Sequence, residues 1–405
     1  MKEWAFFTKY NFNERLVLIV LFAVFSPMPL AIFANSNYLV FQIISTVLCG
    51  VAVGLVSLVI LFNKNTRSLV LHSPYSWCAF PILGISFLSC FIFHNWLGLA
   101  VTALIFFIFV FIFFVRSIIN YIFFNNMLNI IIGLSIIPAI IGILQKYYIL
   151  HYLYPNKLPA RFEGRVYSTF ANPNFYAYII NLVIIIIIYR LIILNKTNSN
   201  DKYRMFYYFS VLALNFIALI LTNCRSSLIT LLIGILIITA LHKKFLLSAG
   251  LLTIYMSYFL FIKLLPGIFP RMDLILLDTS FEERLAIWSN ALSGIKSSPF
   301  IGQGFFAYLN RFSDKVHAHN LLFDILLSSG IVGLSFYILY FFKNIKESFS
   351  LLKSTIGKTI LIFLFAFLTI TILHGITDVP ILGIQSGILF GILLSGFGIK
   401  LEELE

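Results

Sequence analysis

The sequence predicts an all-α, polytopic membrane protein, built as one bundle of about twelve transmembrane helices. The chain is 60% hydrophobic and 11% charged with a mean hydropathy of +1.00, whereas soluble domains are about 25% charged. Uncharged runs such as Ile184–Ile188, together with 45 phenylalanines, supply the apolar surface that lipid requires. We therefore interpret residues 1–405 as a single membrane domain and expect such runs to face lipid.

Apolar windows of about 20 residues, the length that crosses a bilayer, locate the individual helices. The first group is expected at residues 16–33, 39–62, 76–93, 96–115 and 127–145. The second group is expected at residues 174–194, 205–222, 226–241, 245–262, 320–342, 359–374 and 381–399. Their even number places both ends of the chain on the same side of the membrane.

Lysine and arginine are distributed unevenly between two sets of loops. With the N-terminus inside, the loops that face the cytoplasm carry Lys64, Arg67, Arg116, Lys196, Lys202, Arg204, Lys243, Lys244, Lys343, Lys346, Lys353 and Lys358. The short outward loops carry only Arg225. This bias predicts cytoplasmic termini. It also accounts for the formal net charge of +13, and such scattered basic residues do not predict nucleic-acid binding.

Two outward segments, residues 146–173 and 263–319, are too long for simple turns and are candidates for function. Within the second, a helix is expected near residues 280–296, because Thr279 and Ser280 each precede a glutamate by three residues. An apolar stripe at helical spacing follows, formed by Phe281, Leu285, Trp288, Leu292 and Ile295. This amphipathic helix should lie on the membrane interface or cap the bundle.

Arginines are concentrated on the outward side of the expected bundle. They are Arg161 and Arg165 in the first long segment, Arg225 in a short turn, and Arg271, Arg284 and Arg311 in the second long segment. Arg225 is costly at a helix end unless it has a partner or snorkels to lipid headgroups. Arg284 lies about 60° from the apolar stripe, so it borders the buried face unless it is simply solvated. Because guanidinium groups bind phosphate oxygens in bidentate fashion, the cluster predicts an anion pocket.

A second polar feature precedes the helix expected at residue 320, where His317 and His319 are followed by Asn320. A histidine can accept a proton from an attacking hydroxyl near neutral pH, although these residues could instead cap the helix or bind a metal. No third or fourth ligand cluster accompanies them and the outward loops hold no DxD-type acidic pair, so no metal is expected. Asp324, an acid inside an apolar helix, is expected to support the same face.

The other polar side chains in the helices are interpreted as structural. His374 and Asp378 meet at the outward end of the eleventh expected helix. The cysteines have no C-x-x-C spacing, which excludes the usual zinc and disulfide patterns; they are Cys49, Cys78, Cys90 and Cys224.

Four stretches of the chain resemble the O-antigen ligase and polymerase superfamily. They are Arg165–Asn174, Cys224–Leu228, Glu283–Trp288 followed by Pro299–Gly304, and His319–Asn320 followed by Gly330–Gly333. Each motif is weak alone, but their order and shared outward position are fairly specific. The resemblance implies a fold similar to the membrane-embedded C-type glycosyltransferases, in the inner membrane, with the active site on the periplasmic face.

The resemblance also implies a reaction. Members of this superfamily transfer a glycan from undecaprenyl diphosphate to an acceptor hydroxyl, without a metal or other cofactor, and inversion at the anomeric carbon is expected. By this resemblance Arg225, Arg284 and Arg165 would hold the diphosphate and His319 would be the catalytic base. Further candidates for support are Arg161, His317, Asn320 and Asp324. The implied partners are a lipid-linked glycan donor, a lipid or glycan acceptor, and membrane lipids.

Several functions remain open within this interpretation. We favour an O-antigen ligase of lipopolysaccharide biosynthesis, with lipid A-core as acceptor, over a polymerase that extends the lipid-linked glycan with the same residues. A transporter is disfavoured, because transporters place ionisable residues near the bilayer midplane and the candidates here lie at one membrane face. A non-enzymatic scaffold would give no reason for the outward arginines and histidine.

Overall fold

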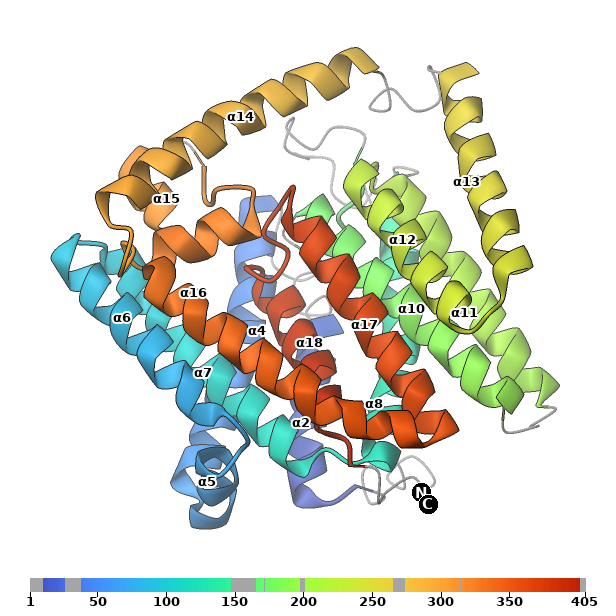
Figure 1. The fold of residues 1–405 in the computed structure, drawn as a ribbon, viewed down its shortest axis with the longest axis horizontal. Coiled ribbons are helices and arrows are strands. Elements are labelled where there is room, and N and C mark those ends of the chain that lie inside the picture. Colours follow the sequence, from blue (N-terminus) through green and yellow to red (C-terminus); the bar gives the residue numbers. More distant parts are fainter. Residues whose placement is uncertain are drawn as a thin grey trace.

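Every regular element in the described part of the chain is a helix. The computed structural model describes residues 10–25, 38–146, 165–170, 172–196, 201–264, 274–313 and 315–400, and no strand occurs within these ranges. The helices form a bundle (Figure 1). The all-α prediction is therefore confirmed, whereas Arg161 and Arg271 lie outside the described residues.

Each helix expected from hydropathy overlaps a helix of the structure. The first part of the chain forms α2 (Phe12–Phe25), α4 (Tyr38–Phe62), α5 (Lys64–Leu71), the 3-10 helix η1 (Ser76–Cys78), α6 (Ala79–Ile92), α7 (Trp96–Ile118) and α8 (Tyr121–Lys146). The second part forms α10 (Pro173–Lys196), α11 (Lys202–Leu221), α12 (Arg225–Leu241), α13 (Phe245–Leu264), α14 (Leu274–Ser297), α15 (Ala307–Phe312), α16 (Leu321–Ser348), η5 (Phe349–Lys353), α17 (Thr355–Gly375), α18 (Ile384–Leu394) and η6 (Ser395–Gly398). The short helices α5 and α15 are additions that the apolar windows did not predict.

Several of these helices are long and apolar enough to cross a membrane. Within the described residues they number six, and they are Trp96–Ile118, Tyr121–Lys146, Pro173–Lys196, Lys202–Leu221, Leu321–Lys353 and Thr355–Gly375. A seventh span results if Thr46–Phe62 is counted with Lys64–Leu71, to which it is bent by 101°. Four other apolar helices are shorter, among them Arg225–Leu241. The protein is thus a helical membrane protein; the described residues hold six or seven spans by length and composition, and the total of about twelve stays a prediction.

The centre of the bundle is α10. Its run Ile184–Ile187 is at most 1% exposed, and its partners include α8, α11, α12 and α17. The expectation that this run supplies lipid-facing surface is therefore wrong. A helix that is apolar on every side is also what a bundle needs at its core, and hydropathy does not separate the two cases.

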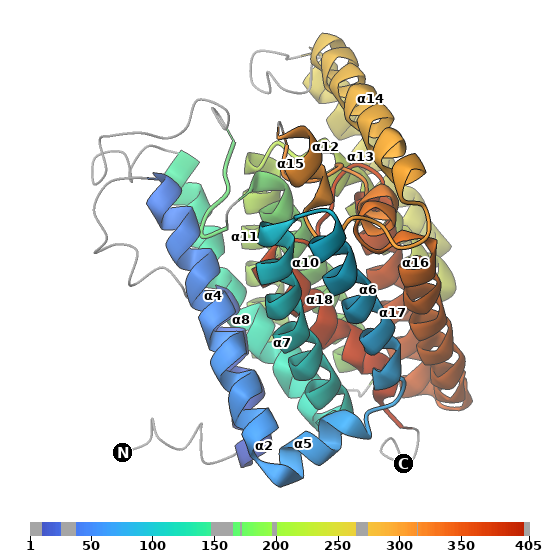
Figure 2. The same ribbon diagram turned by 90° about the vertical axis from the view of Figure 1, so that its left-hand side faces the viewer.

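The two ends of the bundle differ. α14 and α15 lie across one end, and α5 lies at the other (Figures 1 and 2). We call the first the α14 end; there the start of α16 meets the end of α17, since Asn320 Nδ2 donates to the Ile376 carbonyl at 3.1 Å. The opposite end carries Lys64 and Arg67 on α5, two of the basic residues expected in the cytoplasm.

α14 packs on the bundle through a face next to its predicted apolar stripe. Ile287 and Ala291 are buried in a cluster with Tyr308 and Leu327, among others. Three members of the stripe are instead exposed, Phe281 at 54%, Leu285 at 47% and Leu292 at 43%. Arg284 precedes Ile287 by one helical turn, so it is half-buried on the side that faces the bundle.

α16 is broken at Gly330, and the loop before α15 fills the break. Gly330 has φ 63° and ψ −168°, a conformation open only to glycine. The freed backbone groups pair with this loop: the amide of Ile331 donates to the Pro299 carbonyl at 2.8 Å, and the amide of Gly304 donates to the Ser328 carbonyl at 2.9 Å. The Pro299–Gly304 and Gly330–Gly333 motifs therefore form one structural unit.

Candidate active site

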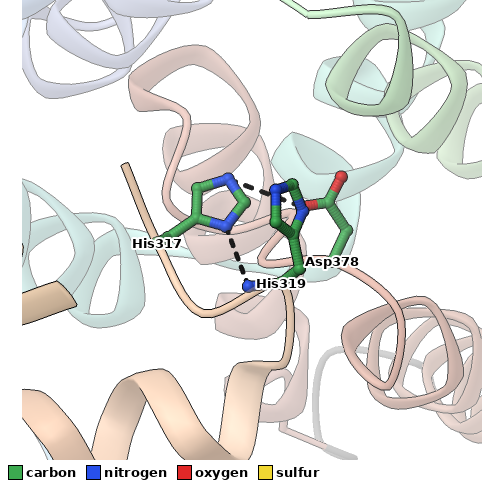
Figure 3. A group of neighbouring side chains, drawn as sticks. All are labelled: His317, His319 and Asp378. Carbon is green, nitrogen blue, oxygen red and sulfur yellow. Dashed lines mark hydrogen bonds and ion pairs between the residues drawn. The ribbon is translucent and has the colours of Figure 1, made fainter. Parts of the chain in front are cut away.

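His319 and Asp378 form a hydrogen-bonded pair at the α14 end. His319 lies in the segment before α16, and Asp378 lies in the turn after α17. Nδ1 of His319 is 3.2 Å from Oδ1 of Asp378 (Figure 3). The Asp378 side chain is 1% exposed and that of His319 24% exposed, so part of the imidazole, but not the carboxylate, is open to solvent.

His317 packs beside this pair and its tautomer is fixed by its contacts. The backbone amide of His319 donates to Nδ1 of His317 at 3.2 Å, so Nδ1 carries a lone pair. Nε2, which lies 3.5 Å from Oδ1 of Asp378, must then carry the proton of the neutral ring. Burial lowers the pKa of His317 to about 4, although the Asp378 carboxylate opposes that shift. His317 is therefore a neutral donor at pH 7.

Asp378 is an ionised carboxylate held by several donors. Its Oδ1 accepts the Val379 amide at 2.9 Å in addition to the His319 ring, and its Oδ2 accepts Nδ2 of Asn174 at 2.6 Å. Burial would raise its pKa, but the hydrogen bond from His319 and the neighbouring imidazoles hold the pKa of Asp378 well below its usual range. Interpreting Asp378 as merely structural missed this contact.

His317, His319 and Asp378 are also the group of described residues whose ligand atoms could surround a metal ion, since these atoms lie within 4.8 Å of one another. A metal on His317 would need the lone pair of Nε2, with the proton on Nδ1. Nδ1 of His317, however, faces the backbone N–H of His319, so a proton on Nδ1 would be directed at the proton of that amide. Metal-bound histidines donate from their other nitrogen, so this cluster fits a hydrogen-bonded carboxylate better than a metal centre.

Arg165 connects the pair to the first turn of α10. Its Nη2 donates to Oδ1 of Asn174 at 2.6 Å, and its Nε donates to the Thr222 carbonyl at 3.0 Å. Asn174 in turn donates to Asp378. The structure thus places Arg165 in the same hydrogen-bond network as His319.

Arg225 on α12 and Arg284 on α14 both lie in the neighbourhood of His374, near the end of α17. Arg225 is the first residue of α12 and half-buried, and Ser227 on the same turn lies 3.2 Å from Nδ1 of His374 (Oγ to Nδ1). Arg284 lies within electrostatic range of the His374 ring. His374 is one turn before Asp378 on the chain, and the Asp378 amide donates to the His374 carbonyl at 3.1 Å, so both arginines lie toward the α14 end of α17.

Asn320 and Asp324 hold the histidine segment in place. Oδ1 of Asn320 accepts the amides of Leu322 and Phe323, which makes it the N-cap of α16. Oδ1 of Asp324 accepts the amide of Ala318 at 3.2 Å, between the two histidines. Both side chains accept backbone N–H groups. Asn320 thereby caps α16, and Asp324 holds the backbone between His317 and His319.

Comparison with known proteins finds a family match in the second half of the chain. Residues 209–338 match the family model described as O-Antigen ligase. That segment contains Arg225, Arg284 and His319, whereas Arg165 and Asp378 lie outside it. The comparison with curated proteins returned no match. This match over residues 209–338 supports the O-antigen ligase superfamily that the motifs indicated.

Proposed function

We propose that this protein is a membrane glycosyltransferase that moves a glycan from undecaprenyl diphosphate to an acceptor hydroxyl at the α14 end of the bundle. We further propose that it acts as an O-antigen ligase, with lipid A-core as the acceptor. The observation that carries the proposal is the hydrogen bond between His319 and Asp378, with Arg225 and Arg284 in the neighbourhood of His374, one turn before Asp378.

His319 is suited to act as the base of this reaction. Asp378 accepts the Nδ1 proton, which leaves the lone pair of the neutral ring on Nε2. When Nε2 takes the proton of the acceptor hydroxyl, the ionised Asp378 stabilises the imidazolium that forms. A positioned base of this kind contributes about 10² to 10⁴-fold in rate.

Arg225 and Arg284 are suited to stabilise the leaving group. In the proposed step, the acceptor oxygen forms a bond to the anomeric carbon as the bond from that carbon to the diphosphate oxygen breaks. The lipid diphosphate leaves with the electron pair, and its growing charge is met by fixed guanidinium groups. In-line displacement inverts the anomeric centre. Because the arginines supply the positive charge, the mechanism needs no metal ion or other cofactor.

The proposed orientation places the α14 end in the periplasm. The opposite end carries Lys64 and Arg67 on α5, and positive residues favour the cytoplasmic side of the inner membrane. Both termini would then be cytoplasmic, and the shorter apolar helices would complete about twelve passes.

A polymerase would use the same residues and differ only in its acceptor. Cells lacking the gene separate the two functions: loss of a ligase leaves long lipid-linked polymer unattached, whereas loss of a polymerase leaves single repeat units. The break in α16 is a feature that transporters share. Here, however, the break is filled by backbone from Pro299–Gly304 rather than left open for cargo, which does not support transport.

The direct test is a reaction with purified components. The protein in nanodiscs is incubated with undecaprenyl diphosphate carrying a glycan, together with either lipid A-core or a second glycan-lipid, and the product is identified by mass spectrometry. Glycosylated lipid A-core is the expected product. Extension of the lipid-linked glycan would replace the ligase proposal by the polymerase, and no transfer to either acceptor would contradict both.

A further inference from the structure

We infer that Arg165 and Asn174 are positioning residues of the catalytic base, and that Arg165 acts through Asn174 and Asp378 rather than by binding the donor diphosphate. The inference rests on the proposed function, because it assigns a role in the same reaction. It revises the role that the sequence resemblance implied for Arg165. Four side chains form the network: Arg165, Asn174, Asp378 and His319.

Asn174 is the central member of this chain of hydrogen bonds. Its Oδ1 accepts from Arg165 at 2.6 Å, and its Nδ2 donates to Oδ2 of Asp378 at 2.6 Å. The Arg165 contact requires an acceptor and the Asp378 contact requires a donor, so the amide has only one orientation that satisfies both. Asn174 thereby presents a fixed N–H to the carboxylate that orients His319.

Arg165 fixes Asn174 through a second anchor point. Its Nε donates to the Thr222 carbonyl at 3.0 Å, in the turn that leads into α12. The planar guanidinium of Arg165 therefore donates to the side chain of Asn174 and to the backbone carbonyl of Thr222 at the same time. This ties the start of α10, which carries Asn174, to the start of α12, which carries Arg225.

The consequence for catalysis concerns Asp378. Its buried carboxylate has two oxygens to satisfy, and Oδ2 has Asn174 as its side-chain donor. Without that donor, the carboxylate can rotate about its last side-chain bond, and Oδ1 no longer holds the ring of His319 at a fixed angle. A displacement of about 1 Å in a catalytic group costs about 10²-fold in rate. The loss should appear in kcat, because the residues that bind the diphosphate are unchanged.

The test compares Asn174→Ala and Arg165→Gln with Arg225→Gln, a variant of the arginine proposed to contact the diphosphate. We expect Asn174→Ala and Arg165→Gln to lower kcat about 10²-fold while the KM for the donor stays within about twofold. Arg225→Gln should raise the donor KM. Titration of undecaprenyl diphosphate into the purified variants measures the same affinity without turnover. Arg165→Lys, which keeps a cationic donor for Asn174, should recover part of kcat.

The opposite result would overturn the inference. If Arg165→Gln raises the donor KM or weakens undecaprenyl diphosphate binding with kcat unchanged, Arg165 is a diphosphate ligand. Full activity in Asn174→Ala would also reject the positioning role. Should Asn174→Ala fail to accumulate in the membrane, the Arg165→Gln and Arg165→Lys pair decides alone. An inactive wild-type protein would instead reject the proposed function itself, and this inference with it.

Discussion

His319 and Asp378 are 59 residues apart in the sequence, yet Nδ1 of His319 lies 3.2 Å from Oδ1 of Asp378. The whole of α16 and α17 separates them, and the two helices return the chain to the same end of the bundle. One residue comes from inside the matched family region and the other from outside it. The site is therefore assembled by the fold rather than by a local motif.

Removing either member of this pair should abolish most of the transfer. We expect His319→Ala to lower kcat by about 10² to 10⁴-fold, because the proton acceptor is lost. Asp378→Asn keeps the shape of the side chain but not its charge, and should also cost at least about 10²-fold. Single-turnover transfer with a fluorescent donor measures both. Normal transfer by His319→Ala protein would exclude it as the base.

Arg284 should contribute to donor binding and to leaving-group departure. We expect Arg284→Ala to lower kcat/KM for the donor by about 10² to 10³-fold, the range for removal of one fixed donor to developing charge. Arg311 provides a control at the same α14 end of the bundle, since it is exposed and donates to Ser297. Arg311→Ala should stay close to wild type. Equal losses in the two variants would indicate a general electrostatic effect and not a diphosphate contact.

Stability should fall in mildly acidic solution because His317 is buried as a neutral ring. Its pKa is lowered to about 4 by burial, so between pH 6.5 and 4 the unfolded chain binds a proton that the folded protein does not. Folding is then weakened as pH falls through this window, by about 3 kcal/mol at its lower end, since one pKa unit equals about 1.4 kcal/mol. Thermal unfolding in detergent at several pH values measures the effect. His317→Asn should flatten this dependence, whereas His94→Asn, at an exposed histidine, should not.

Chelators should leave the reaction intact. His317 offers its Nε2 proton, not a lone pair, toward Asp378. In the proposed mechanism, guanidinium groups supply the positive charge near the leaving group. Activity of protein treated with EDTA and then dialysed should equal that of untreated protein. Lost activity that is restored by one divalent ion would show that the three residues bind a metal in the working enzyme.

The sequence predicted the helices well because each apolar window is long and uninterrupted, but it could not predict which face of a helix is buried. Ile184–Ile187 has the composition of a lipid-facing run and is in fact the centre of the bundle. The motifs singled out His319 and the arginines as candidates, since polar and charged side chains stand out in an apolar chain. The role of Asp378 depends on its contact with His319, which the spacing of nearby residues in the sequence cannot predict. The break at Gly330 was also missed, because glycine does not interrupt an apolar window.

That break yields a last prediction, on the stability of the unit that supports the histidine segment. Gly330 has φ 63° and ψ −168°, and a Cβ at this position would collide with the carbonyl of Phe300. Gly330→Ala must therefore either strain the backbone by about 1 to 3 kcal/mol or displace the Pro299–Gly304 loop. The Tm in detergent should fall, and transfer should fall with it, since the first turns of α16 carry Asn320 and Asp324. Gly54→Ala is the matched control, because nothing lies within 4 Å of the Cβ it would add, so its Tm should be unchanged or higher. If the Gly330→Ala protein is as stable as the Gly54→Ala protein, α16 can continue through position 330 without a break. The position of the Pro299–Gly304 loop then does not depend on glycine at position 330.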